Sequence, residues 1–365
     1  MKQDEIQLVA EIRPEAEPYD PAARAEARRR LTRMSAATAV GGRPRRRVVL
    51  AAVAGVLALA VAATTAEVLR DDRAGVLAGP AGTPPRTVVT LEVSKMSAEE
   101  VFDKAAGAAA ADEPQPRDDQ FIVIESQLMN GVESGGGADS AGRPRPETHW
   151  LQRTRRTAWQ SADGSRETVV KVEHLDPLPY PGWSIPEVAK EDRGTTEWFT
   201  VRDCGHGTPT HYTAVTRLPT DPGRMRDWLY HGDGGESRTD EEAWLLVGDL
   251  LSENYLPPAQ RAALFKAAAG IEGVTVMENA QDAAGRVGIA VGRPGDLGLR
   301  NDLIFDPKTY AFLGERGVVV DAEAAKAPAG SLITSTAQLK VSVADSAPRV
   351  GGLVDLVARL FRGSC

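Results

Sequence analysis

The feature that most constrains this chain is a basic cluster that runs directly into a long apolar segment. Arg45, Arg46 and Arg47 precede Val48–Leu69, which contains no charged residue before Glu67. A membrane-spanning helix needs about 20 mostly apolar residues. A basic excess on one flank keeps that flank in the cytoplasm. The sequence therefore predicts one transmembrane helix here, with the N-terminus in the cytoplasm and the C-terminal part outside the cell membrane.

A secretory signal peptide and a buried globular helix are the two other interpretations of this segment. A secretory signal peptide typically spans about 15–30 residues in all, whereas this apolar run begins only at residue 48. Ala60-Val61-Ala62 offers a small-residue cleavage site, and Arg45–Val49 loosely resembles a twin-arginine export signal. A buried globular helix would not be flanked by polar, low-complexity sequence on both sides. We expect an uncleaved anchor.

Composition fits a membrane-tethered globular protein. The chain has 365 residues, of which 42% are hydrophobic, so a sizeable core is available. Its net charge of −8 gives no signature of direct nucleic-acid binding. The basic excess gathers in residues 1–47, where each charge near anionic lipid headgroups adds about 1 kcal/mol. The expected partner of this tail is therefore the lipid bilayer.

The tail at residues 1–47 is expected to contain two short helices. The second starts with Asp20 as N-cap and Pro21 at the first helical position. Ala27, Leu31 and Met34 then share one apolar face, which is too small to form a core. This face either docks on a cytoplasmic partner or belongs to a charged stalk, and both interpretations stay open. The tail has no His or Cys, which excludes a zinc-containing anti-sigma module.

Beyond the anchor we expect a linker at 70–86, a domain at 87–348 and an extension at 349–365 with a short helix near its end. Ser97 and Glu100 form a capping box that opens a helix. Asp163-Gly164 separates two strand-like segments as a hairpin, and 131–146 reads as a long loop. Helices follow from about residue 220, and short strands return from Val274 onward. This order predicts the α+β class, with an antiparallel sheet covered on one face by helices. The expected strands are Thr87–Val93, Phe121–Met129, Thr148–Gln160, Glu167–His174, Val274–Met277, Val287–Val291, Asp302–Phe305, Val318–Val320 and Leu339–Val343.

The two cysteines do not by themselves predict a disulfide or a metal site. Cys204 and Cys365 could form a disulfide in an oxidising compartment, although the sequence does not place them together. Cys204, His206 and His211 do not have the spacing of a standard zinc site. We therefore expect no metal site.

The sequence also carries no recognisable catalytic motif. It lacks a Gly-x-Ser-x-Gly elbow, a His-Glu-x-x-His pair and a phosphate-binding Gly-x-x-x-x-Gly-Lys-Ser/Thr loop. The acidic pairs Asp118-Asp119 and Glu241-Glu242 are adjacent in sequence and would point apart. Tyr180 and Trp183 are expected to be packing residues. We expect no enzyme activity and no cofactor.

Seven segments of the chain carry a resemblance to a known family: Ile6–Pro14, Asp20–Arg24, Leu218–Pro222, Leu256–Phe265, Ile271–Val274, Asp282–Arg286 and Ile304–Thr309. They resemble an actinobacterial family of uncharacterised single-pass membrane proteins that are commonly encoded beside sigma-factor genes. The resemblance implies a regulatory role and a cytoplasmic N-terminus, and it does not extend to Arg349–Cys365.

A looser resemblance concerns the fold. Asp306-Pro307-Lys308-Thr309, followed by Phe312 and Leu313, is similar to a hairpin of half-barrel lipoprotein carriers and of periplasmic regulators of sigma-factor pathways. The same four residues are also ordinary type I turn chemistry. A half-barrel and a generic α+β sheet both stay open.

Two functions from different classes follow. In the first, the outer domain senses an envelope ligand and the tail passes the signal to a cytoplasmic protein, for which a sigma factor is the candidate. In the second, a lipid-binding or ligand-carrying module is tethered to the membrane and the tail only sets topology. The tail face of Ala27, Leu31 and Met34 discriminates between them, because only the first function uses it.

Overall fold

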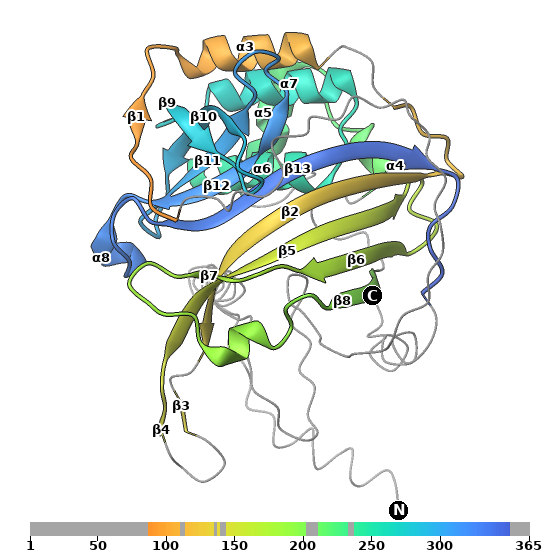
Figure 1. Ribbon diagram of the computed structural model, residues 1–365. Coiled ribbons are helices and arrows are strands. Elements are labelled where there is room, and N and C mark those ends of the chain that lie inside the picture. Colours follow the sequence, from red (N-terminus) through yellow and green to blue (C-terminus); the bar gives the residue numbers. More distant parts are fainter. Residues whose placement is uncertain are drawn as a thin grey trace, which may run out of the picture. The chain divides into compact units, whose positions relative to one another are not determined.

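The computed structural model describes residues 87–109, 114–134, 137–138, 144–201, 211–232 and 237–350. Within these ranges the chain is an α+β protein built around a sheet of 11 described strands, in which β10–β11, β11–β12, β13–β2 and β5–β6 pair antiparallel. Helices gather above one side of this sheet (Figure 1). The predicted fold class is confirmed at this level.

The strand order is β1-β9-β10-β11-β12-β13-β2-β5-β6-β8, with β7 paired to β5. The second half of the chain therefore supplies one side of the sheet, and the first half supplies the other. The strands are β1 (Glu92–Val93), β2 (Phe121–Ser134), β5 (Thr148–Ser161), β6 (Thr168–His174), β7 (Leu178–Pro179), β8 (Thr196–Val201), β9 (Thr275–Gln281), β10 (Val287–Pro294), β11 (Leu299–Phe305), β12 (Phe312–Val319) and β13 (Leu332–Ala344).

The helices begin where the sequence places caps. Ser97 and Thr239 each take part in a full capping box, with Glu100 and Glu242 respectively, and Asp221 caps the helix that starts at Pro222. These side chains satisfy backbone N–H groups that a helix start leaves without partners. The helices are α3 (Ala98–Ala108), α4 (Tyr212–Val215), α5 (Pro222–His231), α6 (Asp240–Glu253), α7 (Pro258–Ala269), α8 (Ala322–Ala325) and the 3-10 turn η1 (Glu187–Lys190).

Residues 87–93 close five of the strands into a ring. β1 pairs with β9, while Val89 N–H donates to Gly330 O at 2.8 Å and Leu332 N–H donates to Thr87 O at 2.9 Å. The segment thus bridges β9 to the start of β13, at the two ends of the run β9 to β13. We call residues 87–93 together with β9–β13 the strand ring.

The two faces of the ring bury different side chains. Along β11, Leu303 and Phe305 pack against the helices in a core that includes Phe102, Trp244 and Phe265. Successive residues of a strand point to opposite faces. The other face of the ring buries two apolar clusters, made by Leu91, Met277, Ala280, Ala290, Ile304 and Leu313, and by Met129, Leu151, Val318 and Leu332.

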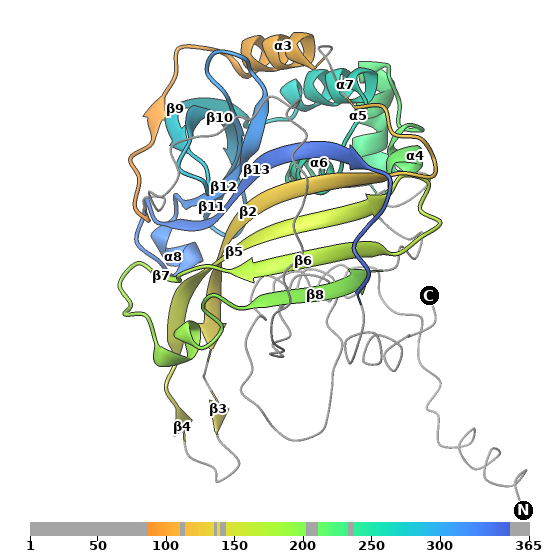
Figure 2. The same cartoon turned by 45° about the vertical axis from the view of Figure 1, so that its right-hand side comes forward.

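β2, β5, β6 and β8 extend the sheet beyond the ring (Figure 2). We call these four strands the open sheet. The predicted hairpin is confirmed, because β5 and β6 pair from Thr154↔His174 to Trp159↔Val169. On the helix side Arg156 forms an ion pair of 2.8 Å with Glu253 at the end of α6. On the other side the rings of Trp159 and Trp198 stack with centroids 5.7 Å apart.

The sequence misplaced some boundaries. β2 continues to Ser134, inside the predicted loop 131–146, and residues 132–147 belong to a separate compact unit in which β3 (Gly137–Ala138) pairs with β4 (Pro144–Arg145). β8 was not predicted, and β13 is much longer than the expected Leu339–Val343. Long strands form here because neighbouring strands supply partners that local sequence does not reveal.

Among the described residues, no helix combines the length and apolar character that crossing a membrane requires. The predicted anchor at 48–69, the tail at 1–47 and the linker at 70–86 lie outside the described residues. These three segments therefore stay predictions.

Candidate functional site

A small cleft lies between helix α6 and strands β11 to β13. Its volume is about 60 Å³. By comparison, pockets for small molecules usually measure about 300–1,000 Å³. The cleft has aromatic, hydroxyl and carboxylate side chains along it, which are contributed by Trp244, Leu245, Gly248, Asn301, Asp302, Leu303, Glu315, Arg316, Thr334 and Thr336.

Glu315 is the chemically most notable residue of this cleft. It lies on β12, and the Ser252 hydroxyl of α6 donates a hydrogen bond to its carboxylate. A Cβ atom at Gly248 would lie 2.8 Å from Glu315 Oε2, so any larger residue there would force the carboxylate to move. The small residue Gly248 of α6 thus leaves room for the Glu315 side chain of β12.

Two carboxyl groups at the contact between α6 and β12, those of Glu315 and Asp249, have raised pKa values. Burial raises the pKa of Glu315 to about 7, and the charges of Asp249 and Glu253 add to the shift, while the Ser252 hydrogen bond opposes it. Burial and the nearby Glu253 raise the pKa of Asp249 to about 6. Asp249 keeps part of its surface exposed, so solvent moderates its interaction with Glu253. Both groups therefore titrate closer to neutral pH than ordinary carboxyl groups.

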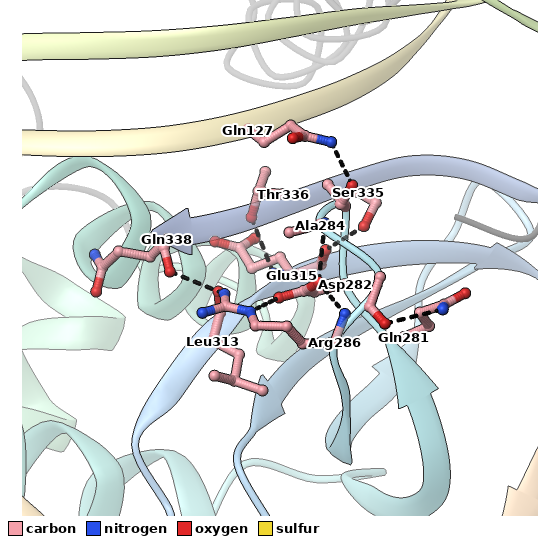
Figure 3. A network of polar contacts seen from close by, with 12 residues as sticks. Gln127, Gln281, Asp282, Ala284, Arg286, Leu313, Glu315, Ser335, Thr336 and Gln338 are labelled. Carbon is pink, nitrogen blue, oxygen red and sulfur yellow. Dashed lines mark hydrogen bonds and ion pairs between the residues drawn. The ribbon is translucent and has the colours of Figure 1, made fainter. Parts of the chain in front are cut away.

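The backbone of Glu315 belongs to a polar network on the same strands (Figure 3). Glu315 N–H donates to Thr336 Oγ1 at 2.9 Å, and the Ser335 hydroxyl donates to Glu315 O at 3.2 Å. Ala283 N–H donates to the Thr336 carbonyl at 3.3 Å. β13 therefore links Glu315 to the hairpin turn between β9 and β10.

That turn, Asp282–Arg286, is buried. Asp282 Oδ1 accepts the N–H groups of Ala284 and Arg286, each at 2.9 Å, and Arg286 Nε donates to Asp282 Oδ2 at 2.6 Å. Arg286 Nη2 reaches the carbonyls of Leu313 and Gln338, both at 2.9 Å. Figure 3 shows Gln127 of β2 directed at the same turn, and its amide donates to Ala283 O at 2.6 Å. The turn thus joins β12, β13 and β2 on the face away from the helices.

A second ionic group is fully buried in the strand ring. Asp302 lies between two arginines, with Arg300 Nε at 2.7 Å and Arg316 Nε at 2.9 Å from its two carboxylate oxygens. Arg300 also donates to the Thr275 hydroxyl and carbonyl, each at 2.7 Å. The charges inside the ring therefore have close partners of opposite sign.

The chemistry open to the cleft is limited. A carboxyl group with a pKa near 7 can gain and lose a proton at neutral pH, as general acids and bases do. None of the lining residues is a histidine, and the Ser252 hydroxyl donates its hydrogen bond to the Glu315 carboxylate. The cleft can hold a few water molecules and exchange protons with them.

Several residues predicted from the sequence to be functional lie outside the described residues. Arg45, Arg46, Arg47, Val48 and Leu69, as well as the face of Ala27, Leu31 and Met34, lie outside the described residues. The same is true of Cys204, His206 and Cys365. Whether the two cysteines pair, and whether the tail binds a partner, therefore remain predictions.

Other predicted details can be compared with the structure. His211 is the N-cap of α4, where its Nδ1 accepts the Ala214 N–H at 3.3 Å. Glu242 completes a capping box, while Glu241 accepts the Asp296 N–H at 3.0 Å, so this acidic pair does split between two structural roles. Tyr180 packs on the apolar cluster of the ring, whereas Trp183 contacts His149 and is 41% exposed. The packing prediction holds for Tyr180 only.

Glu315, Asp249 and Ser252 were not predicted as site residues. One signal was present, since Glu315-Arg316 interrupts the otherwise uncharged strand Phe312–Val319. A second was Gly248 in the middle of an apolar helix, where glycine is unfavourable unless something must approach closely. Connecting them required the pairing of α6 with β12, which local patterns do not contain.

Comparison of the chain with protein-family models, with curated proteins and with solved structures finds no match.

Proposed function

We propose that this chain is a single-pass membrane protein whose extracytoplasmic α+β domain acts as a non-enzymatic sensor or regulator. The basic tail at 1–47 would couple the domain to a cytoplasmic protein, for which a sigma factor is the leading candidate. The proposal combines the predicted anchor at Val48–Leu69, the apolar tail face around Leu31 and the family resemblance.

The filled interior of the strand ring is the observation that favours a sensor or regulator over a lipid or ligand carrier. A carrier needs an enclosed apolar cavity of a few hundred Å³. The ring interior is instead occupied by buried side chains, including Met277, Ile304 and Leu313, and by the Arg300–Asp302–Arg316 group. The cleft beside Glu315 has a volume of about 60 Å³ and polar walls. Both observations favour recognition on the surface of the domain over enclosure of a ligand.

We extend the proposal to the finer fold description, a sheet related to the half-barrels of envelope regulators. Two observations support it. The sheet is long and antiparallel with helices on one side. The turn after β11 is built by Asp306, whose carboxylate accepts the N–H groups of Lys308 and Thr309 at 2.9 and 2.8 Å.

The test is an affinity purification of the full-length protein from native membranes after mild cross-linking. Wild type is compared with Leu31→Asp, which places a charge on the apolar tail face, and with Thr32→Asp. The second variant adds the same charge about 100° away around the helix. Proteins and phospholipids that copurify are identified by mass spectrometry.

We expect a sigma factor with wild type and with Thr32→Asp, and its loss with Leu31→Asp. Recovery of no sigma factor with the wild-type protein would reject coupling through the tail. One phospholipid retained per chain after detergent exchange would instead support the carrier function.

A further inference from the structure

Helix α6 is attached by polar contacts to both parts of the sheet. Near its start, Trp244 Nε1 donates to Asn301 O of β11 at 2.9 Å. At its end, Glu253 O accepts the Gln160 amide at 2.6 Å, and the Glu253 carboxylate forms an ion pair of 2.8 Å with Arg156. Gln160 and Arg156 belong to β5. α6 therefore connects the strand ring to the open sheet.

Between these attachments, the second half of α6 (residues 248–253) packs on a carboxyl group that has no basic partner. Glu315 of β12 accepts the hydrogen bond of the Ser252 hydroxyl, and it lies where a side chain at Gly248 would have to be. In the described part of the chain, no lysine or arginine pairs with the Glu315 carboxylate. Its negative charge therefore has no close positive charge to offset it.

The charged groups around this contact are Asp249 and Glu253 of α6, Asp302 of β11, Arg316 of β12 and Arg156 of β5. Both arginines are engaged by other carboxylates, since Arg316 Nε lies 2.9 Å from Asp302 and Arg156 pairs with Glu253. The last turn of α6 contains no basic residue, and the carbonyl groups at a helix end carry partial negative charge. An ionised Glu315 is therefore repelled by the second half of α6.

The protonation state of Glu315 thus affects how firmly α6 holds β12. Its pKa of about 7 places the loss of its proton within the neutral range, and Asp249, with a pKa of about 6, is then already ionised. Ionised Glu315 gains from contact with water, and the cleft of about 60 Å³ beside it is where water can enter. Separation of residues 248–253 from β12 would supply that water, while Trp244 keeps the start of α6 attached.

We propose that the second half of α6 is a proton-operated switch, which packs on β12 when Glu315 is protonated and is shifted toward a separated state when Glu315 is ionised. Separation loosens the contacts of Glu253 with Arg156 and Gln160, so the change reaches the open sheet. The switch depends on the described domain alone. Its use as an envelope signal rests on the sensor function proposed above.

The test is hydrogen exchange of the full-length protein in detergent at pH 6 and pH 8, corrected for the intrinsic rates. Each pH is measured with and without about 1 M urea, because urea accelerates exchange through global unfolding far more than exchange through local opening. With a pKa of about 7 when packed and about 4.3 when free, the opening constant should rise about tenfold between these pH values. We expect residues 248–253 to lose about tenfold in protection, with little dependence on urea.

Two variants identify the titrating group. Glu315→Gln is uncharged at both pH values and should show equal protection at both, and Glu315→Met replaces it if Glu315→Gln does not fold. Glu323→Gln is the matched control, because Glu323 is an exposed acid on α8, and it should keep the tenfold change.

Three results overturn the switch. The first is equal protection of residues 248–253 at both pH values in the wild-type protein. The second is a change that depends on urea as strongly as exchange in α7, because the whole domain then unfolds. The third is a change that persists in the uncharged variants. These measurements involve neither the tail nor a partner, so they leave coupling through Leu31 to its own test.

Discussion

The strand ring and the open sheet belong to one sheet, yet they treat charge and apolar surface differently. The ring buries Arg300, Asp302 and Arg316 together on the face away from the helices. The open sheet keeps its comparable pair, Lys171 and Glu173, partly in water. Closure by residues 87–93 encloses this face, so its charged side chains pair with one another instead of with water. The difference suggests that the ring provides stability and that the open sheet is available for contacts.

The largest expected effect is at Asp302. Asp302→Ala leaves two buried guanidinium groups without their shared carboxylate, and we expect a loss of about 3–5 kcal/mol in the free energy of unfolding. Urea denaturation followed by circular dichroism measures it. The matched change in the open sheet, Glu173→Ala, should cost at most about 1 kcal/mol. Equal losses at the two sites would remove the distinction between ring and open sheet.

The next effect is expected at the buried turn. Asp282→Ala deprives two N–H groups and Arg286 of their acceptor, which should cost about 2–3 kcal/mol. Asp306→Ala is the control, since Asp306 also accepts two N–H groups but lies in a more accessible turn. We expect a loss of about 1 kcal/mol or less for Asp306→Ala. A comparable fall in melting temperature for both variants would show that burial of the Asp282–Arg286 turn does not increase its contribution to stability.

Glu315 should make stability depend on pH. Its folded pKa of about 7 lies above the unfolded value of about 4.3, so the folded chain binds more protons between these two pH values. Stability contributed by the protonated group is therefore lost as pH rises through this window, by on the order of 3–4 kcal/mol. Glu315→Gln should flatten the profile of unfolding free energy against pH.

Asp249→Asn provides the companion measurement. Because the charge of Asp249 raises the pKa of Glu315, its removal should shift the remaining transition to lower pH. A profile for Glu315→Gln that keeps the wild-type slope would mean that another group titrates.

The smallest effect is expected on the face of the open sheet that carries Trp159 and Trp198. Trp198→Ala removes a half-buried ring stacked on Trp159, and the coupling between the two rings should be about 0.5–1.5 kcal/mol. A double-mutant cycle with Trp159→Ala measures this coupling. Additive losses would mean that the two rings contribute independently.

Local sequence was sufficient for elements with strong boundary residues. The capping box at Ser97 and the hairpin at Asp163-Gly164 appear where the sequence predicts them. These features depend on contacts within a few residues, so local patterns determine them.

Features that depend on distant partners were not predictable. Asp282–Arg286 reads as an ordinary surface turn, and only Gln127, Leu313 and Gln338 make it a buried one. β8 follows a proline-containing segment, and it forms a strand because it pairs with β6, which local sequence does not show. The raised pKa of Glu315 likewise requires α6 to pack on β12.

The closure of the ring also bears on the order in which this chain can fold. Val88 bridges to Ser331, and these residues lie more than 240 positions apart. Contacts this distant form slowly, because a very long loop must be ordered before they are made. During synthesis the strand at residues 87–93 emerges early and waits for β9 and the start of β13. Its free backbone groups, and the unfilled interior it later covers, are then exposed to proteases and to pairing with other chains.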